Sequence, residues 1–292
     1  MPPNKNIIFA ILATTFLFAF HDATLKYLTA FFAVPLLVWA RYVVQRVIMS
    51  LTLVPVMGRD IIVTERPVLM LLRAGMQVCT ALLVQLSLKH LPLAETTALV
   101  FMSPSLVTLL AGSVLGEKQR FYHWFAIAAG FAGVLLIARP SDVTSGLGVL
   151  YALAAALSNA MYQLLTCKLA VSEPPMRQLF YLSLVGAVVM SFAVPEYWAG
   201  ELPSLTQAAL LVIAALCVAA GHFLFISAAR VTPAATLSAL LYFKLVWATM
   251  LGLAMFGQLP DSISVVGMAV IGASGLFLAL YRSPATAGEA GQ

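Results

Sequence analysis

About ten apolar segments, joined by short connections, make up most of this chain of 292 residues. Each is close to the roughly 20 residues that a helix needs to cross the hydrocarbon core of a bilayer. Hydrophobic residues form 62% of the chain and charged residues only 9%, whereas a soluble domain carries about 25% charged residues. The sequence therefore predicts an all-α polytopic protein of the lipid bilayer. The expected spans lie near residues 7–28, 34–55, 67–88, 93–115, 121–138, 147–169, 177–195, 205–228, 233–256 and 263–281.

The two halves of the chain resemble each other. "SLKHLPLAETTALVFMSPSLVTLLAGSVLGE" aligns with "SAARVTPAATLSALLYFKLVWATMLGLAMFGQ", and "LKYL" of the first span aligns with "CKLA" of the sixth. Copies with an odd number of spans lie in opposite orientations, an architecture common in alternating-access transporters. The sequence predicts two inverted five-helix repeats around a central cavity, at 7–138 and 147–281, and a disordered tail at 282–292.

The positive charges of the connections predict the orientation of the chain, since cytoplasmic loops are enriched in Lys and Arg. With a cytoplasmic N-terminus, the inner side collects Lys5, Arg59, Arg66, Lys118, Arg120, Lys168, Arg177, Arg230 and Arg282. The outer side keeps only Lys26, Lys89 and Arg139. We therefore expect a bacterial-type cytoplasmic (inner) membrane protein with both termini in the cytoplasm.

Small residues are concentrated in the fifth and tenth spans, where Ala129 and Gly133 have the small-xxx-small spacing. Gly267, Gly272 and Gly275 continue this composition in the tenth span. Such residues allow helices to approach closely. We expect these spans to form a scaffold, and the chain to be a monomer or a weak homo-oligomer.

The motifs of enzymes are absent from the sequence, which contains no H-E-x-x-H, no G-x-S-x-G and no Walker lysine loop. Cys79, Cys167 and Cys217 lie singly in apolar runs, as packing residues do. We expect neither catalysis, nor a metal or cofactor, nor a nucleic-acid partner. The inverted repeats instead favour a gradient-driven carrier of a small-molecule solute. A channel or an intramembrane enzyme is the alternative of a different class.

Polar residues inside the spans are the candidates for solute binding, because burying them in a bilayer is costly. Thr97 and Phe101 share one face of the fourth span at about 100° per residue, and their repeat counterparts Ser238 and Tyr242 share a face of the ninth. We expect these two stripes to face each other across a cavity that suits an amphipathic solute. The alternative is hydrogen-bonded packing between helices.

The sixth span offers Asn159, Tyr162 and Gln163, either as cavity lining or as polar contacts between helices. Lys244 lies near the middle of the ninth span, where the first repeat has Ser103. A charge within the membrane indicates a function, and this ammonium is a candidate for holding a substrate carboxylate. The alternative is a structural ion pair with a neighbouring helix.

Three further groups are candidates for proton coupling: His21, Asp22 and His222. Asp22 and Lys26 are also spaced i,i+4, which suits a simple ion pair on one helix face. His222 has the alternative role of a neutral residue bonded to a neighbouring helix. Three arginines are expected to have structural roles, with long side chains that reach the interface: Arg41, Arg46 and Arg73.

The ends of three spans carry a resemblance to a family. "SPSLVTLLAGSVLGEK" in the fourth span, "AGFAGVLLIARP" in the fifth and "FGQ" closing the ninth are similar to the EamA-type members of the drug/metabolite transporter superfamily. The resemblance covers nearly the whole chain. It implies a ten-helix secondary transporter that moves small organic solutes by alternating access.

Within that superfamily, the branch that exports aromatic and other amino acids is similar to this chain around Cys79, at 104–106, at Tyr162 with Lys168 and at 242–243. This resemblance implies amino-acid export across the inner membrane. Lys244-Leu245 departs from the Thr-Pro of the branch, and Ser103 and Asn159 stand where it carries tryptophan. The opening "FHDATLKYL…VPLLVWARY" resembles uptake carriers for adenosylmethionine-like metabolites. Uptake of such a nucleotide-like or cationic metabolite, or drug export, is the alternative.

Overall fold

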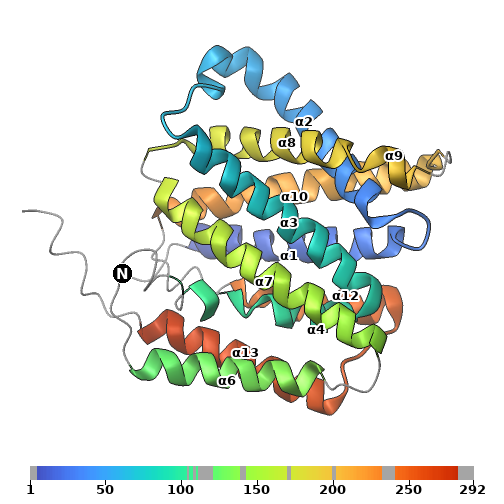
Figure 1. Cartoon of the computed structure of the whole chain (residues 1–292), viewed down its shortest axis with the longest axis vertical. Coiled ribbons are helices and arrows are strands. Elements are labelled where there is room, and N and C mark those ends of the chain that lie inside the picture. The colour runs from blue at the N-terminus through green and yellow to red at the C-terminus, as the bar shows by residue number, and fades with distance from the viewer. Residues whose placement is uncertain are drawn as a thin grey trace, which may run out of the picture.

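The computed structural model describes residues 5–103, 105–107, 110, 121–138, 143–169, 172–198, 202–231 and 241–281. Within these ranges the chain is all-α, with helices joined by turns and short loops (Figure 1). The helices are α1 (Lys5–Leu28), α2 (Val34–Met57), α3 (Pro67–His90), α4 (Leu93–Val100), α6 (Phe121–Ala138), α7 (Val143–Leu169), α8 (Pro175–Ser191), α9 (Val194–Tyr197), α10 (Leu205–Val231), α12 (Phe243–Phe256) and α13 (Ser262–Tyr281), with a 3-10 turn at Gly58–Ile61.

Five stretches of the described helices are long and apolar enough to cross a membrane: Phe9–Leu28, Val34–Thr52, Pro67–His90, Gly146–Thr166 and Leu205–Phe225. Four shorter apolar stretches add to them: Leu93–Val107, Ile127–Ile137, Phe243–Phe256 and Ser262–Phe277. Large apolar side chains are exposed along most of these helices. Such a surface suits lipid, in which helices satisfy their own backbone hydrogen bonds. The tail at 282–292 lies outside the described residues.

The helices of the two halves pair in a reciprocal pattern. The contact of α1 with α10 has its counterpart in the contact of α7 with α3. In the same way, the contact of α1 with α12 corresponds to that of α7 with α4, and the contact of α2 with α10 corresponds to that of α8 with α3. α2 also packs against α8, and α6 against α13. Exchanging the two halves leaves this list of contacts unchanged, as expected for a polytopic fold built from two repeats. In Figure 1, α6 and α13 lie side by side at one end of the molecule and α2 lies at the other.

α6 and α13 approach each other closely because a glycine of each helix lies at the contact. A Cβ atom on Gly133 would lie 2.8 Å from the carbonyl oxygen of Gly267, and a Cβ on Gly267 would lie 2.7 Å from the carbonyl oxygen of Gly133. No larger residue fits at either position without moving the neighbouring backbone. The close packing predicted for the fifth and tenth spans is therefore confirmed.

The fourth and ninth spans are interrupted at counterpart positions. α4 ends at Val100 and is followed by a turn at Phe101 and Met102, whereas α12 begins at Phe243, directly after a turn at Tyr242. The rings of Phe101 and Tyr242 lie side by side, with centroids 4.9 Å apart. Transporters built from inverted repeats often place their binding sites at such discontinuous helices.

Candidate functional site

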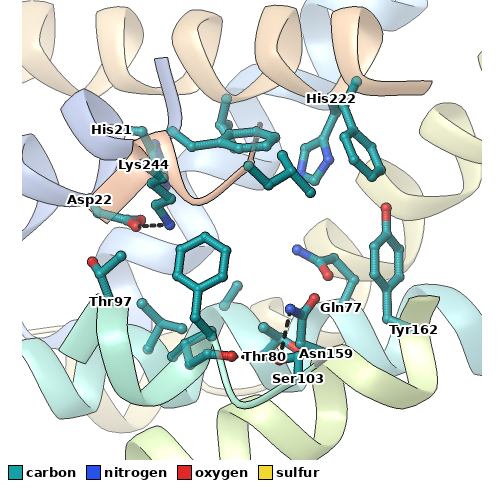
Figure 2. Close-up of a pocket in the computed structure, with 18 of the residues that line it drawn as sticks. His21, Asp22, Gln77, Thr80, Thr97, Ser103, Asn159, Tyr162, His222 and Lys244 are labelled. Atoms are coloured by element: carbon teal, nitrogen blue, oxygen red, sulfur yellow. Dashed lines mark hydrogen bonds and ion pairs between the residues drawn. The ribbon is translucent and has the colours of Figure 1, made fainter. Parts of the chain in front are cut away.

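A cavity lies where α1, α2, α3, α4, α7, α10 and α12 meet, so helices of both halves enclose it. Figure 2 shows Asp22, His21 and Lys244 on one side, and Asn159 and Ser103 facing them from another. The phenyl and phenol rings that line the cavity come from Phe18, Phe101, Tyr162 and Phe225. The cavity thus combines apolar walls with a small number of polar and charged groups, as is typical of sites for small molecules.

Most of the candidate residues from the sequence come together at this cavity. It is lined by Thr97, Phe101, Asn159, Tyr162, Gln163, Lys244, His21, Asp22 and His222. Ser238 lies outside the described residues. Tyr242 is not a lining residue, because its hydroxyl group lies against Gly275 of α13. Because Gly275 has no side chain, the phenol of Tyr242 fits against α13. Tyr242 therefore points away from the helix face that it was expected to share with Ser238.

Lys244 is joined to Asp22 across the contact between α12 and α1. Its Nζ lies 2.7 Å from Oδ2 of Asp22, and the two side chains are only 20% and 11% exposed. Lys26 takes no part, because its Nζ donates to the carbonyl oxygen of Leu91 at 2.6 Å. The suggested ion pair of Asp22 with Lys26 is therefore wrong, and the ion pair of Lys244 with a neighbouring helix occurs.

His21 links α1 to two other helices through both ring nitrogens. Nδ1 lies 2.9 Å from the carbonyl oxygen of Ala214 on α10, and Nε2 lies 2.8 Å from Nη1 of Arg41 on α2. A carbonyl oxygen only accepts hydrogen bonds, so the proton is on Nδ1 and Nε2 accepts from the guanidinium. Arg41 also lies over the ring of Tyr42, at 4.4 Å from its centroid. Arg41 is 4% exposed, so the expectation that it reaches the interface is wrong.

Arg73 is buried completely and joins the two halves behind the cavity. Its Nε donates to Oγ1 of Thr166 at 2.8 Å, its Nη2 to the hydroxyl of Tyr162 at 3.0 Å, and its Nη1 to the carbonyl of Gln178 at 3.3 Å. Its guanidinium also lies 4.6 Å from the ring centroid of Tyr162. Arg73 therefore does not reach the interface, and it fixes the position of a cavity-lining tyrosine.

Neutral polar groups occupy the opposite part of the cavity. Nδ2 of Asn159 on α7 donates to Oγ of Ser103 at 3.1 Å. His222 lies edge-on to the ring of Phe18, with centroids 5.0 Å apart, and its Nδ1 is buried with no hydrogen-bond partner among the described residues. The hydrogen bond expected from His222 to a neighbouring helix is therefore not made by Nδ1 among the described residues. No group of three or more His, Cys, Asp or Glu residues that could hold a metal ion occurs within the described ranges.

The model of the EamA-like transporter family matches this sequence twice, at residues 5–139 and 146–281. The chain belongs to the EamA-like transporter family. It is 27% identical to the S-adenosylmethionine uptake transporter of Rickettsia bellii, over 76% of this chain and 75% of that relative. It is also 27% identical to the riboflavin transporter of Vibrio cholerae serotype O1, over 66% of this chain and 64% of that relative.

A crystal structure of a protein with 17% sequence identity superposes with a TM-score of 0.65, over 95% of this chain and 97% of that one. At this identity the likeness shows the fold alone. Together with the named relatives, the two matched segments make this EamA-like chain a membrane transporter of small metabolites in the drug/metabolite superfamily. Family membership does not define the substrate, so the substrate is inferred from the residues that line the cavity.

Several lining residues of this EamA-like transporter were missed from the sequence. Gln77, Thr80 and Gln85 come from α3 and Arg41 from α2. Gln77 and Gln85 differ by eight residues, which places them about 80° apart on an ideal helix and so on one broad face, and this spacing was the available signal. Arg41 gave none, because only the tertiary structure shows that the guanidinium turns inward to His21.

Proposed function

We propose that this transporter takes up an aromatic metabolite of the adenosylmethionine kind, which carries cationic groups and a carboxylate, by alternating access through the central cavity. The observation that carries the proposal is the ion pair of Asp22 and Lys244 on the wall of an aromatic-lined cavity. Asp22 would attract an ammonium or sulfonium group of the solute, and the cationic side chains of the cavity would attract its carboxylate.

The rest of the lining suits the remainder of such a solute. The rings of Phe101 and Tyr162 are surfaces on which a nucleobase or another planar group can stack. Hydroxyl and amide groups of Thr97, Asn159 and Gln163 are available to fix its orientation. The segment that resembles adenosylmethionine carriers, "FHDATLKYL", supplies both His21 and Asp22, and the name of the Rickettsia relative supports the same substrate class.

Export of amino acids, aromatic ones included, is the second candidate function. It is favoured by Lys244, whose ammonium at the cavity wall offers a partner for a carboxylate, and by the ring of Phe101. In either case we place the protein in the inner membrane with both termini in the cytoplasm. Arg66, Lys168 and Arg177 favour this orientation. His21, Asp22 and His222 stay candidates for proton coupling.

The test is uptake of labelled adenosylmethionine by proteoliposomes that contain the purified full chain. Unlabelled adenosylmethionine, aromatic amino acids, riboflavin, nucleosides and organic cations are offered as competitors, with protein-free liposomes as the control. Saturable uptake and counterflow by adenosylmethionine would support the proposal, and saturation separates a carrier from a channel. Competition by amino acids alone would favour the second candidate. Chemical change of the recovered solute would indicate an enzyme, and a lack of any competition would overturn both transport proposals.

A further inference from the structure

Positive charge exceeds negative charge around the cavity. Arg41, Lys244 and Asp22 line it, and Arg73 lies fully buried behind Tyr162. Asp22 already forms an ion pair with Lys244. Neither arginine has a carboxylate within ion-pair distance among the described residues. A buried cation is stable only when an anion or several hydrogen bonds compensate it, so each arginine requires such compensation.

The two arginines differ in how far the protein satisfies them. Every nitrogen of the Arg73 guanidinium donates to an oxygen atom of α7 or α8. Among the described residues, the Arg41 guanidinium makes one hydrogen bond, to Nε2 of His21, although the residue is only 4% exposed. Its Nε is buried and has no hydrogen-bond partner in the part of the chain that the structure describes. Because a guanidinium carries five N–H donors, most of the hydrogen-bonding capacity of Arg41 is unused.

The surroundings of Arg41 hold it in place and leave the cavity side open. His21 accepts one N–H, and the ring of Tyr42 lies 4.4 Å from the guanidinium carbon. His222 lines the same cavity as Arg41 and Lys244. The lining therefore has an excess of positive charge, because Arg41 lies beside the ion pair of Lys244 and Asp22, and Asp22 is the only carboxylate among the described lining residues. An anionic group is the ligand that this charge favours.

We infer that Arg41 binds the carboxylate of the transported solute, and that the cavity selects solutes that carry one. This inference rests on the proposed function, because it places the solute in the same cavity. A guanidinium matches a carboxylate with two parallel N–H···O bonds. Lys244 is less suited to this role, since its ammonium is already neutralised by Asp22. Removing the carboxylate from a solute should weaken its binding about tenfold or more.

Matched pairs of competitors test the inference in proteoliposomes. Adenosylmethionine is compared with its decarboxylated analogue, and phenylalanine with phenylethylamine, as inhibitors of labelled adenosylmethionine or phenylalanine uptake. For the wild type, we expect the carboxylate member of each pair to be the stronger inhibitor by about tenfold or more. For Arg41→Gln the ratio should fall towards one, and Arg41→Lys should retain part of it. Equal inhibition by both members in the wild type would overturn the inference.

Arg46→Gln is the matched control, because Arg46 lies on the same helix but stacks on Phe180, at 3.9 Å from the ring centroid, and does not line the cavity. It should leave the inhibition ratio unchanged. An Arg41→Gln protein that retains the wild-type ratio would contradict a role for Arg41 in recognition.

Binding can also be measured without transport, by heating the detergent-purified full chain with benzoate or with uncharged benzyl alcohol. We expect benzoate alone to raise the melting temperature of the wild type, and to lose this effect in Arg41→Gln. Equal stabilisation of both proteins by benzoate would overturn the Arg41 site. If benzoate acts as expected while no solute is transported, the proposed function fails and the carboxylate site stands.

Discussion

Nζ of Lys244 lies 2.7 Å from Oδ2 of Asp22, which joins the ninth span to the first. In the other half, Asn159 on α7 donates to Ser103, which follows α4, at 3.1 Å. Ser103 is the repeat counterpart of Lys244. One half therefore uses an ion pair where the other uses a neutral hydrogen bond. We therefore expect a charged solute to be recognised on the side of the cavity that holds the ion pair.

The energetic coupling of Asp22 and Lys244 is measurable with a double-mutant cycle. Asp22→Asn and Lys244→Met should each slow uptake about tenfold or more, because each leaves a partly buried charge without its partner. The double variant should lose less than the product of the two single effects. Lys89→Met, at an exposed lysine of α3, is the control. Strictly multiplicative losses would show that the two residues act independently.

Much of the fold was predictable because a bilayer imposes length and composition on each span. The repeat alignment also placed Phe101 opposite Tyr242, and their rings lie in contact. The direction of Tyr242 was not predictable, since it depends on the interruption of the ninth span and on the space beside Gly275. Helical periodicity assumes a continuous helix, and this assumption fails where a span is broken.

The charged residues show a sharper limit of the sequence. Spacing suggested that Asp22 pairs with Lys26, but the carbonyl oxygen of Leu91 receives the ammonium of Lys26. Lys244, 222 residues away from Asp22 along the chain, takes its place. Such partners come from tertiary packing, which local spacing does not encode. The same reason hid Arg41, whose inward direction is set by His21.

Arg73 is expected to position Tyr162 for the solute and to hold the two halves together. Arg73→Lys keeps the charge but cannot reproduce three divergent hydrogen bonds. It should cost about 1–3 kcal/mol of stability and also weaken solute binding. Tyr162→Phe should have a smaller effect, because it removes one acceptor and keeps the ring. Thermal unfolding and the KM of uptake check both variants, and a stable Arg73→Lys protein with normal KM would exclude the positioning role.

The glycine contact between α6 and α13 should tolerate no side chain. Gly133→Ala places a Cβ against the backbone of Gly267, and overpacking of this kind costs about 1–3 kcal/mol. Gly75→Ala on α3 is the matched control, because a Cβ there meets nothing within 4 Å. Alanine favours a helix more than glycine does, so this variant should be neutral or slightly stabilising. Equal melting temperatures for the two variants would contradict the close approach.

Glu173 connects the two halves at the end of the molecule that we place in the cytoplasm. It accepts a hydrogen bond from Thr64 in the α2–α3 connection and forms an ion pair with Arg177 at 2.7 Å. Arg177 in turn donates to the carbonyl oxygen of Asp60 at 2.7 Å. Burial opposes the charged form of Glu173, but the bonds from Thr64 and Arg177 outweigh it and hold the pKa of Glu173 below its ordinary value.

This lowered pKa predicts how stability depends on pH. A carboxyl whose pKa is lower in the folded state stabilises the protein above its unfolded pKa, about 4.3 for Glu. The contribution is lost as the pH falls through the lower, folded-state pKa. Glu173→Gln should therefore lower the melting temperature by about 2–5 °C at pH 7, and the difference from the wild type should shrink below about pH 4. A difference that stays constant from pH 7 to pH 3 would show that Glu173 contributes through packing and not through its charge.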